Sequence, residues 1–362
     1  MKRMNIKMFF SGLLVMVAVA MTAVSCEEWL DPQSLGSNGT PGTEGGGSVY
    51  NKPSEAYAEN LRQYFKTPHR IVHGWFGNWT GIGPGALMSL PDSTDLISLW
   101  LCTGNLTADQ QADVKAFRER GGRAVLCWRA GNIGDGLTPA GVRRNTQAGR
   151  FEPVDFWGVD YDLSVESRLE GARNYANAII DTVRKYDLDG FDYDFEDGGT
   201  LYSGDAPQVL ETFLLTLADA FDEDGRMLII DMNAEDQGEP SNSYRMLTQD
   251  VVTRVTYFIW QLYKSDDPSS LNRSISNASK YPDEVNQETI RKSIYTSSIE
   301  ESNLSGHFLG QARTMSTRNL EYAGLGVYHI EYDYSPAKGS VRTYPQLREV
   351  IRLINPPIGI EQ

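Results

Sequence analysis

The stretch that decides the fold is Asp189-Gly190-Phe191-Asp192-Tyr193-Asp194-Phe195-Glu196, in which acidic and aromatic side chains alternate. Successive side chains of an extended strand point to opposite faces. The last three acidic residues therefore share one face, and the three aromatic residues share the other. We expect the aromatic face to pack against helices and the acidic face to point into a barrel.

On both sides of this stretch, short apolar or β-branched runs alternate with longer amphipathic runs, a pattern typical of parallel strands connected by helices. Strands are predicted over 70–76, 95–102, 123–128, 190–196, 227–233, 255–263, 293–299 and 324–332, and helices over 107–120, 165–186, 207–222, 307–319 and 344–353. Thr107 is expected to cap its helix, and Gly121-Gly122 to end it. Eight such units without a glycine-rich dinucleotide fingerprint favour an α/β fold, a single-domain (β/α)8 TIM barrel over residues 50–362.

Three carboxylates in a column are costly, because each buried charge loses hydration and repels its neighbours. The same repulsion raises some of their pKa values, and an acid that keeps its proton can protonate a leaving group. Glu196 stands at the carboxyl end of its strand, where TIM barrels place their chemistry, so it is the predicted proton donor. A calcium loop is disfavoured by the interleaved aromatic residues. A divalent-metal hydrolase site stays open as an alternative.

The acidic strand resembles the DGxDxDxE signature of glycoside hydrolase family 18 at every fixed position, and that family carries the motif on the fourth strand of a TIM barrel. The resemblance implies that Glu196 protonates the glycosidic oxygen. Asp194 would orient the 2-acetamido group of the substrate, whose carbonyl oxygen attacks the anomeric carbon to form an oxazolinium, and Asp192 would share a proton with Asp194. This retaining, substrate-assisted route requires an N-acetylated sugar. It needs no cofactor.

A second polar signal is Gln261-Leu262-Tyr263, at the end of the sixth predicted strand. By itself it could be two ordinary polar residues at a strand end. Beside the acidic strand it resembles the QxY pair of the family's endo-β-N-acetylglucosaminidases, in which Tyr263 would donate a hydrogen bond to the acetamido oxygen. The short connection over 300–323 leaves no room for the extra subdomain of tunnel-shaped chitinases. The expected function is therefore cleavage of the GlcNAc-β1,4-GlcNAc chitobiose core of N-glycans; the alternatives are a chitinase-type hydrolase and a non-catalytic, cell-surface glycan-binding protein.

Residues predicted to bind substrate lie at the ends of other strands: Trp75, Trp128, Asp231, Asn233, Tyr328 and Tyr332. For each of them, packing or solvent exposure is an equally good interpretation. The family's SxGG motif is degenerate at 127–132, and the tryptophan expected at the end of the eighth strand is absent, which leaves Tyr328 or Tyr332 to form the floor of the sugar site. The loops 131–160 and 235–242 are the expected specificity elements.

The N-terminus reads as a lipoprotein signal peptide over residues 1–25, with Lys2, Arg3 and Lys7 before an apolar run over 9–24. Cys26 would be lipidated, and residues 26–49, rich in Gly, Ser, Thr and Pro, would form a flexible linker. The acidic residues 27, 28 and 31 resemble the export tag of surface lipoproteins. We therefore expect an outer-membrane protein that faces the cell exterior; a plain acidic linker is the alternative.

The formal net charge of -15 disfavours nucleic acid and anionic lipid as partners. Cys102 and Cys127 lie in apolar runs and are expected to be buried free thiols, although a bridge between them stays open. The chain has four scattered histidines and no CxxC spacing, so no metal site is predicted.

Overall fold

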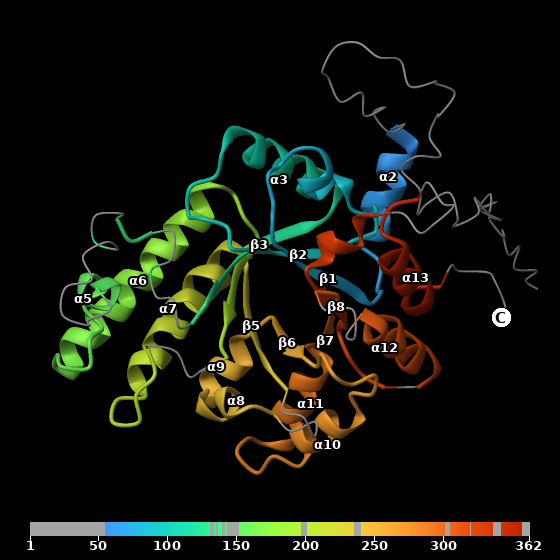
Figure 1. Ribbon diagram of the computed structural model, residues 1–362. Coiled ribbons are helices and arrows are strands. Elements are labelled where there is room, and N and C mark those ends of the chain that lie inside the picture. The colour runs from blue at the N-terminus through green and yellow to red at the C-terminus, as the bar shows by residue number, and fades with distance from the viewer. Residues whose placement is uncertain are drawn as a thin grey trace, which may run out of the picture.

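Eight parallel strands close into a barrel in which each strand pairs with the next along the chain and β8 pairs with β1 (Figure 1). They are β1 (Ile71–Phe76), β2 (Leu96–Trp100), β3 (Arg123–Arg129), β4 (Gly190–Asp194), β5 (Met227–Asn233), β6 (Tyr257–Gln261), β7 (Ser293–Ser298) and β8 (Gly324–Tyr328). The predicted TIM barrel is confirmed, and the acidic stretch forms its fourth strand.

The computed structural model describes residues 55–130, 134, 137–139, 142, 152–196, 201–234, 240–300, 305–318, 320–335 and 342–356. The predicted signal peptide, Cys26 and the linker lie outside these residues, as do parts of both predicted specificity loops. No helix in the described ranges has the length and apolar character needed to cross a membrane.

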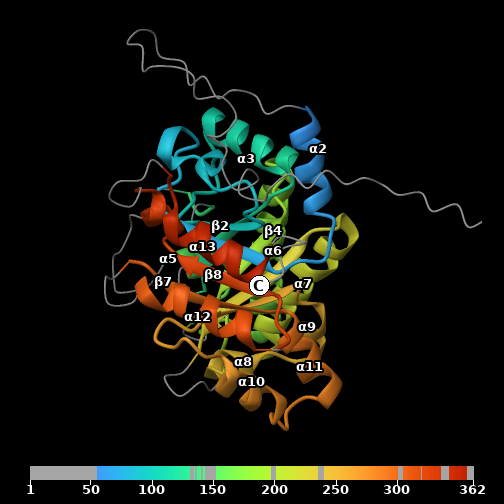
Figure 2. The same cartoon turned by 90° about the vertical axis from the view of Figure 1, so that its right-hand side faces the viewer.

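The helices surround the barrel (Figures 1 and 2). They are α2 (Glu55–Tyr64), α3 (Ala108–Arg120), α5 (Glu152–Trp157), α6 (Val165–Lys185), α7 (Gln208–Asp224), α8 (Asn242–Met246), α9 (Gln249–Arg254), α10 (Ser269–Ser276), α11 (Asp283–Arg291), α12 (Ser305–Thr317) and α13 (Pro345–Ile354). The five predicted helices are present, and between β7 and β8 the described residues form only α12. The Thr107 side chain caps α3 in a capping box with Gln110, and Gly121 ends that helix in the left-handed conformation, as predicted.

Helix α2 lies near the end of the barrel where the strands begin. The Tyr57 hydroxyl donates to Asp92, which precedes β2. Near the other end of α2, the Tyr64 ring packs on His69 at 4.4 Å between centroids, and the Tyr64 hydroxyl accepts a hydrogen bond from Asn355 at 3.4 Å. This helix therefore lies at the edge of the barrel, near the starts of β1 and β2 and away from the carboxyl ends of the strands.

The alternation on β4 is as predicted. Phe191, Tyr193 and Phe195 are buried in the core between the barrel and the helices, and Tyr193 packs against Phe213 of α7 at 5.3 Å between ring centroids. The opposite face of the strand carries Asp192, which is fully buried inside the barrel. The hydrophobic burial on one face thus holds the costly acidic face in place.

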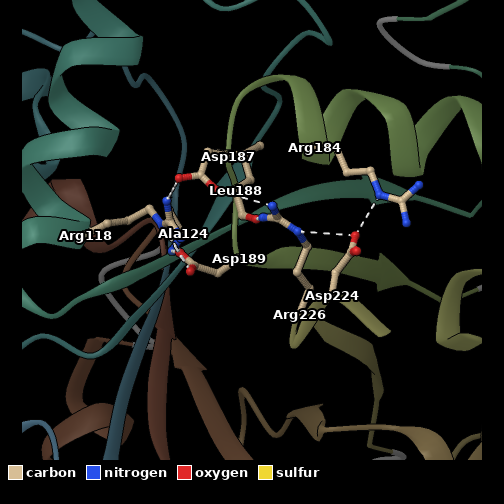
Figure 3. Close-up of polar contacts among 8 residues, drawn as sticks. All are labelled: Arg118, Ala124, Arg184, Asp187, Leu188, Asp189, Asp224 and Arg226. Atoms are coloured by element: carbon tan, nitrogen blue, oxygen red, sulfur yellow. Dashed lines mark hydrogen bonds and ion pairs between the residues drawn. The ribbon is translucent and has the colours of Figure 1, made fainter. Parts of the chain in front are cut away.

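An ion-pair network fixes the beginning of β4 (Figure 3). Arg118 of α3 donates from Nε to both carboxylate oxygens of Asp189 at 3.0 Å, and Asp189 Oδ2 accepts the backbone N–H of Ala124 in β3 at 2.8 Å. Arg226, which follows α7, contacts Asp187 and the carbonyl of Leu188. Hydrogen bonds and ion pairs therefore connect the start of the acidic strand to β3, to α3 and to the residue that follows α7.

Gly190 is required at the first position of β4. Its φ of 151° is one that L side chains rarely adopt, and an added Cβ would lie 2.0 Å from the carbonyl oxygen of Met227 in β5. The glycine of the motif thus permits the close approach of β4 and β5.

Four predicted carboxyl ends of strands are corrected by two residues or more. Strand β2 ends at Trp100 and not at residue 102, because Leu101 adopts a left-handed conformation (φ 58°). The eighth strand ends at Tyr328 and not at residue 332, because His329 adopts a left-handed conformation (φ 57°) and the chain continues as the 3-10 helix η3 (Ile330–Tyr334). Strands β4 and β6 end at Asp194 and Gln261. Glu196 and Tyr263 therefore lie just beyond their strands.

Candidate active site

Asp192 is held inside the barrel by donors from β1 and β2. Its Oδ2 accepts from the Ser98 hydroxyl at 2.6 Å and from the Trp75 indole N–H at 3.2 Å. His73 lies behind Ser98, with 3.0 Å between Nε2 and Oγ, and burial lowers the pKa of this imidazole to about 3. A neutral histidine, a serine and a tryptophan thus orient the first carboxylate of the column.

Asp194 and Asp231 meet above Asp192 through the amide of Gln261. Gln261 Nε2 donates to Asp231 Oδ1 at 2.8 Å and to Asp194 Oδ1 at 3.4 Å. A carboxylate oxygen of Asp231 also lies within 4.8 Å of one of Asp192. The sharing of a proton between Asp192 and Asp194 stays a prediction, and Asp231 of β5 is a third carboxyl beside them.

Burial raises the pKa of all three carboxyls. It raises the pKa of Asp192 to about 6, although hydrogen bonds from Ser98 and Asp231 act in the opposite direction. The pKa of Asp194 is well above its usual range, first through burial and then through the charges of Glu196 and Asp192. The pKa of Asp231 is raised by burial and by Asp194 and Asp192. The column therefore retains protons close to neutral pH.

Glu196 is the member of this column that reaches solvent. Its side chain is 24% exposed, whereas Asp192, Asp194 and Asp231 are between 0% and 4% exposed. Glu196 Oε2 lies 3.2 Å from Nη2 of Arg129, at the end of β3. The backbone carbonyl of Glu196 accepts from the Ser243 hydroxyl at 3.2 Å. The geometry places an accessible carboxyl beside a guanidinium and above three buried carboxyls.

Tyr263 lies beside the same carboxyls. Burial raises the pKa of its hydroxyl well above the usual range, and the charges of Asp231, Asp194 and Glu196 add to that effect. The Tyr263 ring lies nearly parallel to that of Tyr328, with 6.1 Å between centroids. At this pKa the phenol keeps its proton and can donate a hydrogen bond.

Two tryptophans extend this aromatic wall at Tyr328. Trp75 and Trp100 meet the Tyr328 ring edge-on, at 6.1 and 6.2 Å between centroids. Tyr328 is partly exposed, so of the two tyrosines proposed from sequence it is the one that lies beside Tyr263. Trp100 and Tyr328 are partly exposed and can offer an aromatic face to the apolar C–H side of a sugar ring, whereas Trp75 is buried and its indole N–H donates to Asp192.

The other four residues that were predicted to contact substrate do not form part of this aromatic wall. Trp128 is wrong as a substrate contact, because it lies in the helix-facing core, edge-on to Phe191 at 5.7 Å between ring centroids, and its indole donates to the carbonyl of Cys102. Tyr332 is 48% exposed on η3 and stacks on His329. Asn233 is exposed at the end of β5. Asp231 is fully buried, so its partners are the other carboxyls.

Sequence reasoning did not identify Ser98, Trp100 or Arg129 as parts of the site. Leu96 and Trp100 pack inside the barrel, and Ser98 lies between them on β2. A single hydroxyl within an apolar strand was the available signal for Ser98. Arg129 is opposite Asp194 in the register of β3 and β4, which the sequence of one strand cannot disclose.

Cys127, Asp192 and Asp231 bring three potential metal-ligand atoms within 4.8 Å of one another. Burial raises the pKa of the Cys127 thiol well above its usual range, and the three buried aspartates add to that effect. All three side chains are buried, and in the structure as it stands the Cys127 thiol is a donor to Asp231 Oδ2 at 3.9 Å. Cys127 and Cys102 are both free, as expected.

A model of glycoside hydrolase family 18, BT1044-like, matches residues 37–353. The chain belongs to glycoside hydrolase family 18. The structure of a variant of BT1044 with one Glu→Gln substitution is 32% identical to this family 18 chain, with a TM-score of 0.64, and the match covers 83% of this chain and 92% of that one.

Two more distant structures share the family 18 fold. An endo-β-N-acetylglucosaminidase from Cordyceps militaris is 18% identical, with a TM-score of 0.58 and coverage of 84% of this chain and 97% of that chain. A GH18 chitinase from Pseudoalteromonas aurantia is 12% identical, with a TM-score of 0.52 and coverage of 78% and 99%. No curated protein matches the chain.

Proposed function

We propose that this family 18 hydrolase is a mannosyl-glycoprotein endo-β-N-acetylglucosaminidase, which cleaves the GlcNAc-β1,4-GlcNAc bond in the core of N-glycans. Glu196 donates its proton to the glycosidic oxygen as the bond to the anomeric carbon breaks. The acetamido oxygen of the same sugar attacks that carbon and forms an oxazolinium. Water then opens the ring, and Glu196 takes back a proton, so that the configuration is retained.

The observation that carries this proposal is the difference in accessibility along the carboxylate column. Glu196 reaches solvent, whereas the nearby Asp192, Asp194 and Asp231 are buried and hold pKa values above their usual range. A buried, protonated carboxyl is a poor nucleophile. The acetamido group of the substrate supplies a nucleophile without any further carboxylate, and Asp194 is placed to orient it.

Gln261 and Tyr263 support the choice of an N-glycan core over chitin. Gln261 bridges Asp194 and Asp231, and the protonated Tyr263 hydroxyl lies beside them as a donor to the acetamido oxygen. An endo-β-N-acetylglucosaminidase of the same fold, from Cordyceps militaris, has been crystallised with fucosyl-N-acetylglucosamine-Asn. What favours a glycan attached to asparagine over chitin is the resemblance of Gln261-Leu262-Tyr263 to the QxY pair of endo-β-N-acetylglucosaminidases.

The test is incubation of the purified protein with an N-glycosylated protein and, separately, with a chitin oligosaccharide, followed by mass spectrometry. The expected result is a glycoprotein that retains a single GlcNAc and a released glycan with the other GlcNAc at its reducing end. The matched control is Glu196→Gln, which keeps the size of the side chain and should fold without turnover. Cleavage of chitin alone would overturn the choice of substrate, and turnover by the Glu196→Gln variant would overturn the acid.

We propose separately that a lipid on Cys26 anchors the protein, because this part of the proposal rests only on the sequence before residue 55, which lies outside the described residues. Lipid on Cys26 would place the enzyme on the outer membrane, facing the cell exterior. Cys26→Ala should abolish incorporation of a radiolabelled fatty acid and release the protein from the membrane fraction. Equal labelling of the wild type and this variant would contradict the anchor.

A further inference from the structure

Asp192 has one carboxylate oxygen with an incomplete environment. Its Oδ2 accepts hydrogen bonds from Ser98 and Trp75. Its Oδ1 is buried and has no hydrogen-bond partner among the described residues. Asp231 is the carboxyl that can fill this gap, because one of its oxygens lies within 4.8 Å of an Asp192 oxygen, next to the Cys127 thiol. A carboxyl can play that part only while it carries a proton.

The surroundings of Asp231 fit a protonated carboxyl. Its Oδ1 accepts from Gln261 at 2.8 Å, and the Cys127 thiol lies 3.9 Å from Oδ2. The residue has no exposed surface and lies between the acceptors Asp192 and Asp194. No cation within the described residues forms an ion pair with Asp231. Ionisation there would place a third charge in the column without compensation.

We propose that Asp231 is a positioning residue for the hydrolysis: it carries a proton, donates it to Asp192 Oδ1, and through its other oxygen fixes the Gln261 amide against Asp194. The proton of Asp231 thereby orients the two carboxyls below the sugar without contacting the substrate. This inference rests on the proposed function for its kinetic consequence. Its structural content, a neutral Asp231, does not depend on the substrate.

The groups that set the charge around Asp231 come from three other strands and their ends. They are Cys127 of β3, Asp192 and Asp194 of β4 with Glu196 beyond it, and Tyr263 after β6, with Arg129 of β3 beside Glu196. Most of them are acidic or neutral. Arg129 is the cation of this set, and it pairs with Glu196 at the mouth of the site and not with Asp231.

The test compares Asp231→Asn with Asp231→Leu. Asparagine has the shape and charge of a protonated aspartate, and its N–H₂ can donate to Asp192 while its oxygen accepts from Gln261. Leucine is neutral and branched at the same carbon, but it is larger than aspartate and offers neither bond. Asp181→Asn on the exposed face of α6 is the matched control for the chemical change.

The expected result is that Asp231→Asn keeps kcat within the same order of magnitude and leaves the pH profile of kcat/KM in place. Asp231→Leu should lower kcat by about 100-fold, as expected when a group below the reacting atoms is misplaced. The acidic limb of the pH profile of kcat/KM should also move to higher pH in Asp231→Leu. The reason is that Asp192 loses a hydrogen bond that lowers the pKa of Asp192. A shift of the whole profile to lower pH in Asp231→Asn would mean that a charge had been removed, and would overturn the proposal.

Infrared spectroscopy gives a readout that needs no activity. The wild type should show a carbonyl band of protonated carboxyls at pH 7, to which Asp194 also contributes. The difference spectrum between the wild type and Asp231→Asn should show the loss of one such carboxyl, and the difference spectrum of Asp181→Asn should not. A loss of the band with no hydrolysis by the wild type would retain the neutral Asp231 and reject the proposed function. An unchanged band in Asp231→Asn would reject the neutral Asp231 whatever the enzyme hydrolyses.

Discussion

At the scale of single residues, the site contains one carboxyl that solvent can reach and others that are buried and held in a fixed orientation. Glu196 is exposed to solvent beside Arg129, whereas Asp192 and Asp194 are buried and held by hydrogen bonds. In the proposed mechanism the exposed residue exchanges the proton, and the buried residues orient the substrate. A substitution that leaves the shape of a buried residue intact should therefore separate these two roles.

Tyr263→Phe tests the hydroxyl that lies beside the carboxyls. We expect kcat to fall by about 10²- to 10³-fold, because the variant loses one donor to the developing charge on the acetamido oxygen. KM should change little, since the ring still packs against Tyr328. Steady-state kinetics on a defined glycopeptide would measure both parameters. Tyr328→Phe, which keeps the same stacked pair, is the control, and an unchanged kcat in Tyr263→Phe would remove the hydroxyl from the mechanism.

At the scale of elements, the first residue of β4 controls the distance between two strands. Gly190→Ala would place a Cβ 2.0 Å from the carbonyl oxygen of Met227 and force a strained φ. We expect the free energy of unfolding to fall by about 3 kcal/mol, from strain alone. Urea denaturation would measure this loss. Gly204→Ala is the control, because an added Cβ there meets no atom within 4 Å; equal stability of the two variants would contradict the close approach of β4 and β5.

The element scale also shows what the sequence could predict. The alternation of acidic and aromatic residues was enough to predict that the acidic face of β4 points into the barrel, because three aromatic residues on the other face had to pack against helices. It failed for Trp128, since β3 has no such reference and a tryptophan near a strand end was interpreted as part of the site. Ser98 and Arg129 depend on the register between strands, and the end of β8 depends on the left-handed His329. None of these features can be predicted from the residue pattern of a single strand.

At the scale of the whole molecule, the buried carboxyls oppose stability as the pH rises. Asp192 has a pKa of about 6 in the folded protein against an ordinary value of 3.8, so the folded state binds more protons between these values. Its contribution is fully present below pH 3.8 and is lost as the pH rises through 6. The protein therefore gives up stability near neutral pH to maintain its site, a trade-off common in enzymes.

Asp192→Asn should recover this stability. We expect the variant to exceed the wild type by about 3 kcal/mol in free energy of unfolding at pH 7, and the difference should disappear toward pH 4. Urea denaturation of both proteins at intervals between pH 4 and 8 would measure it. Contributions from titrating groups cancel in the comparison, except those of Asp194 and Asp231, whose pKa values depend on the charge of Asp192. A difference that is the same at every pH would assign the effect to packing instead of titration.

The position of helix α2 shows at which end of the barrel the N-terminal segment enters. The helix lies against Asp92, His69 and Asn355, near the end of the barrel where the strands begin, and Glu196 lies at the other end. A linker that enters through residue 55 therefore joins the barrel at the end opposite to Glu196. With the proposed anchor at Cys26, the linker would leave the mouth of the site uncovered. A glycan still attached to a bulky folded glycoprotein could then reach the site without passing the linker.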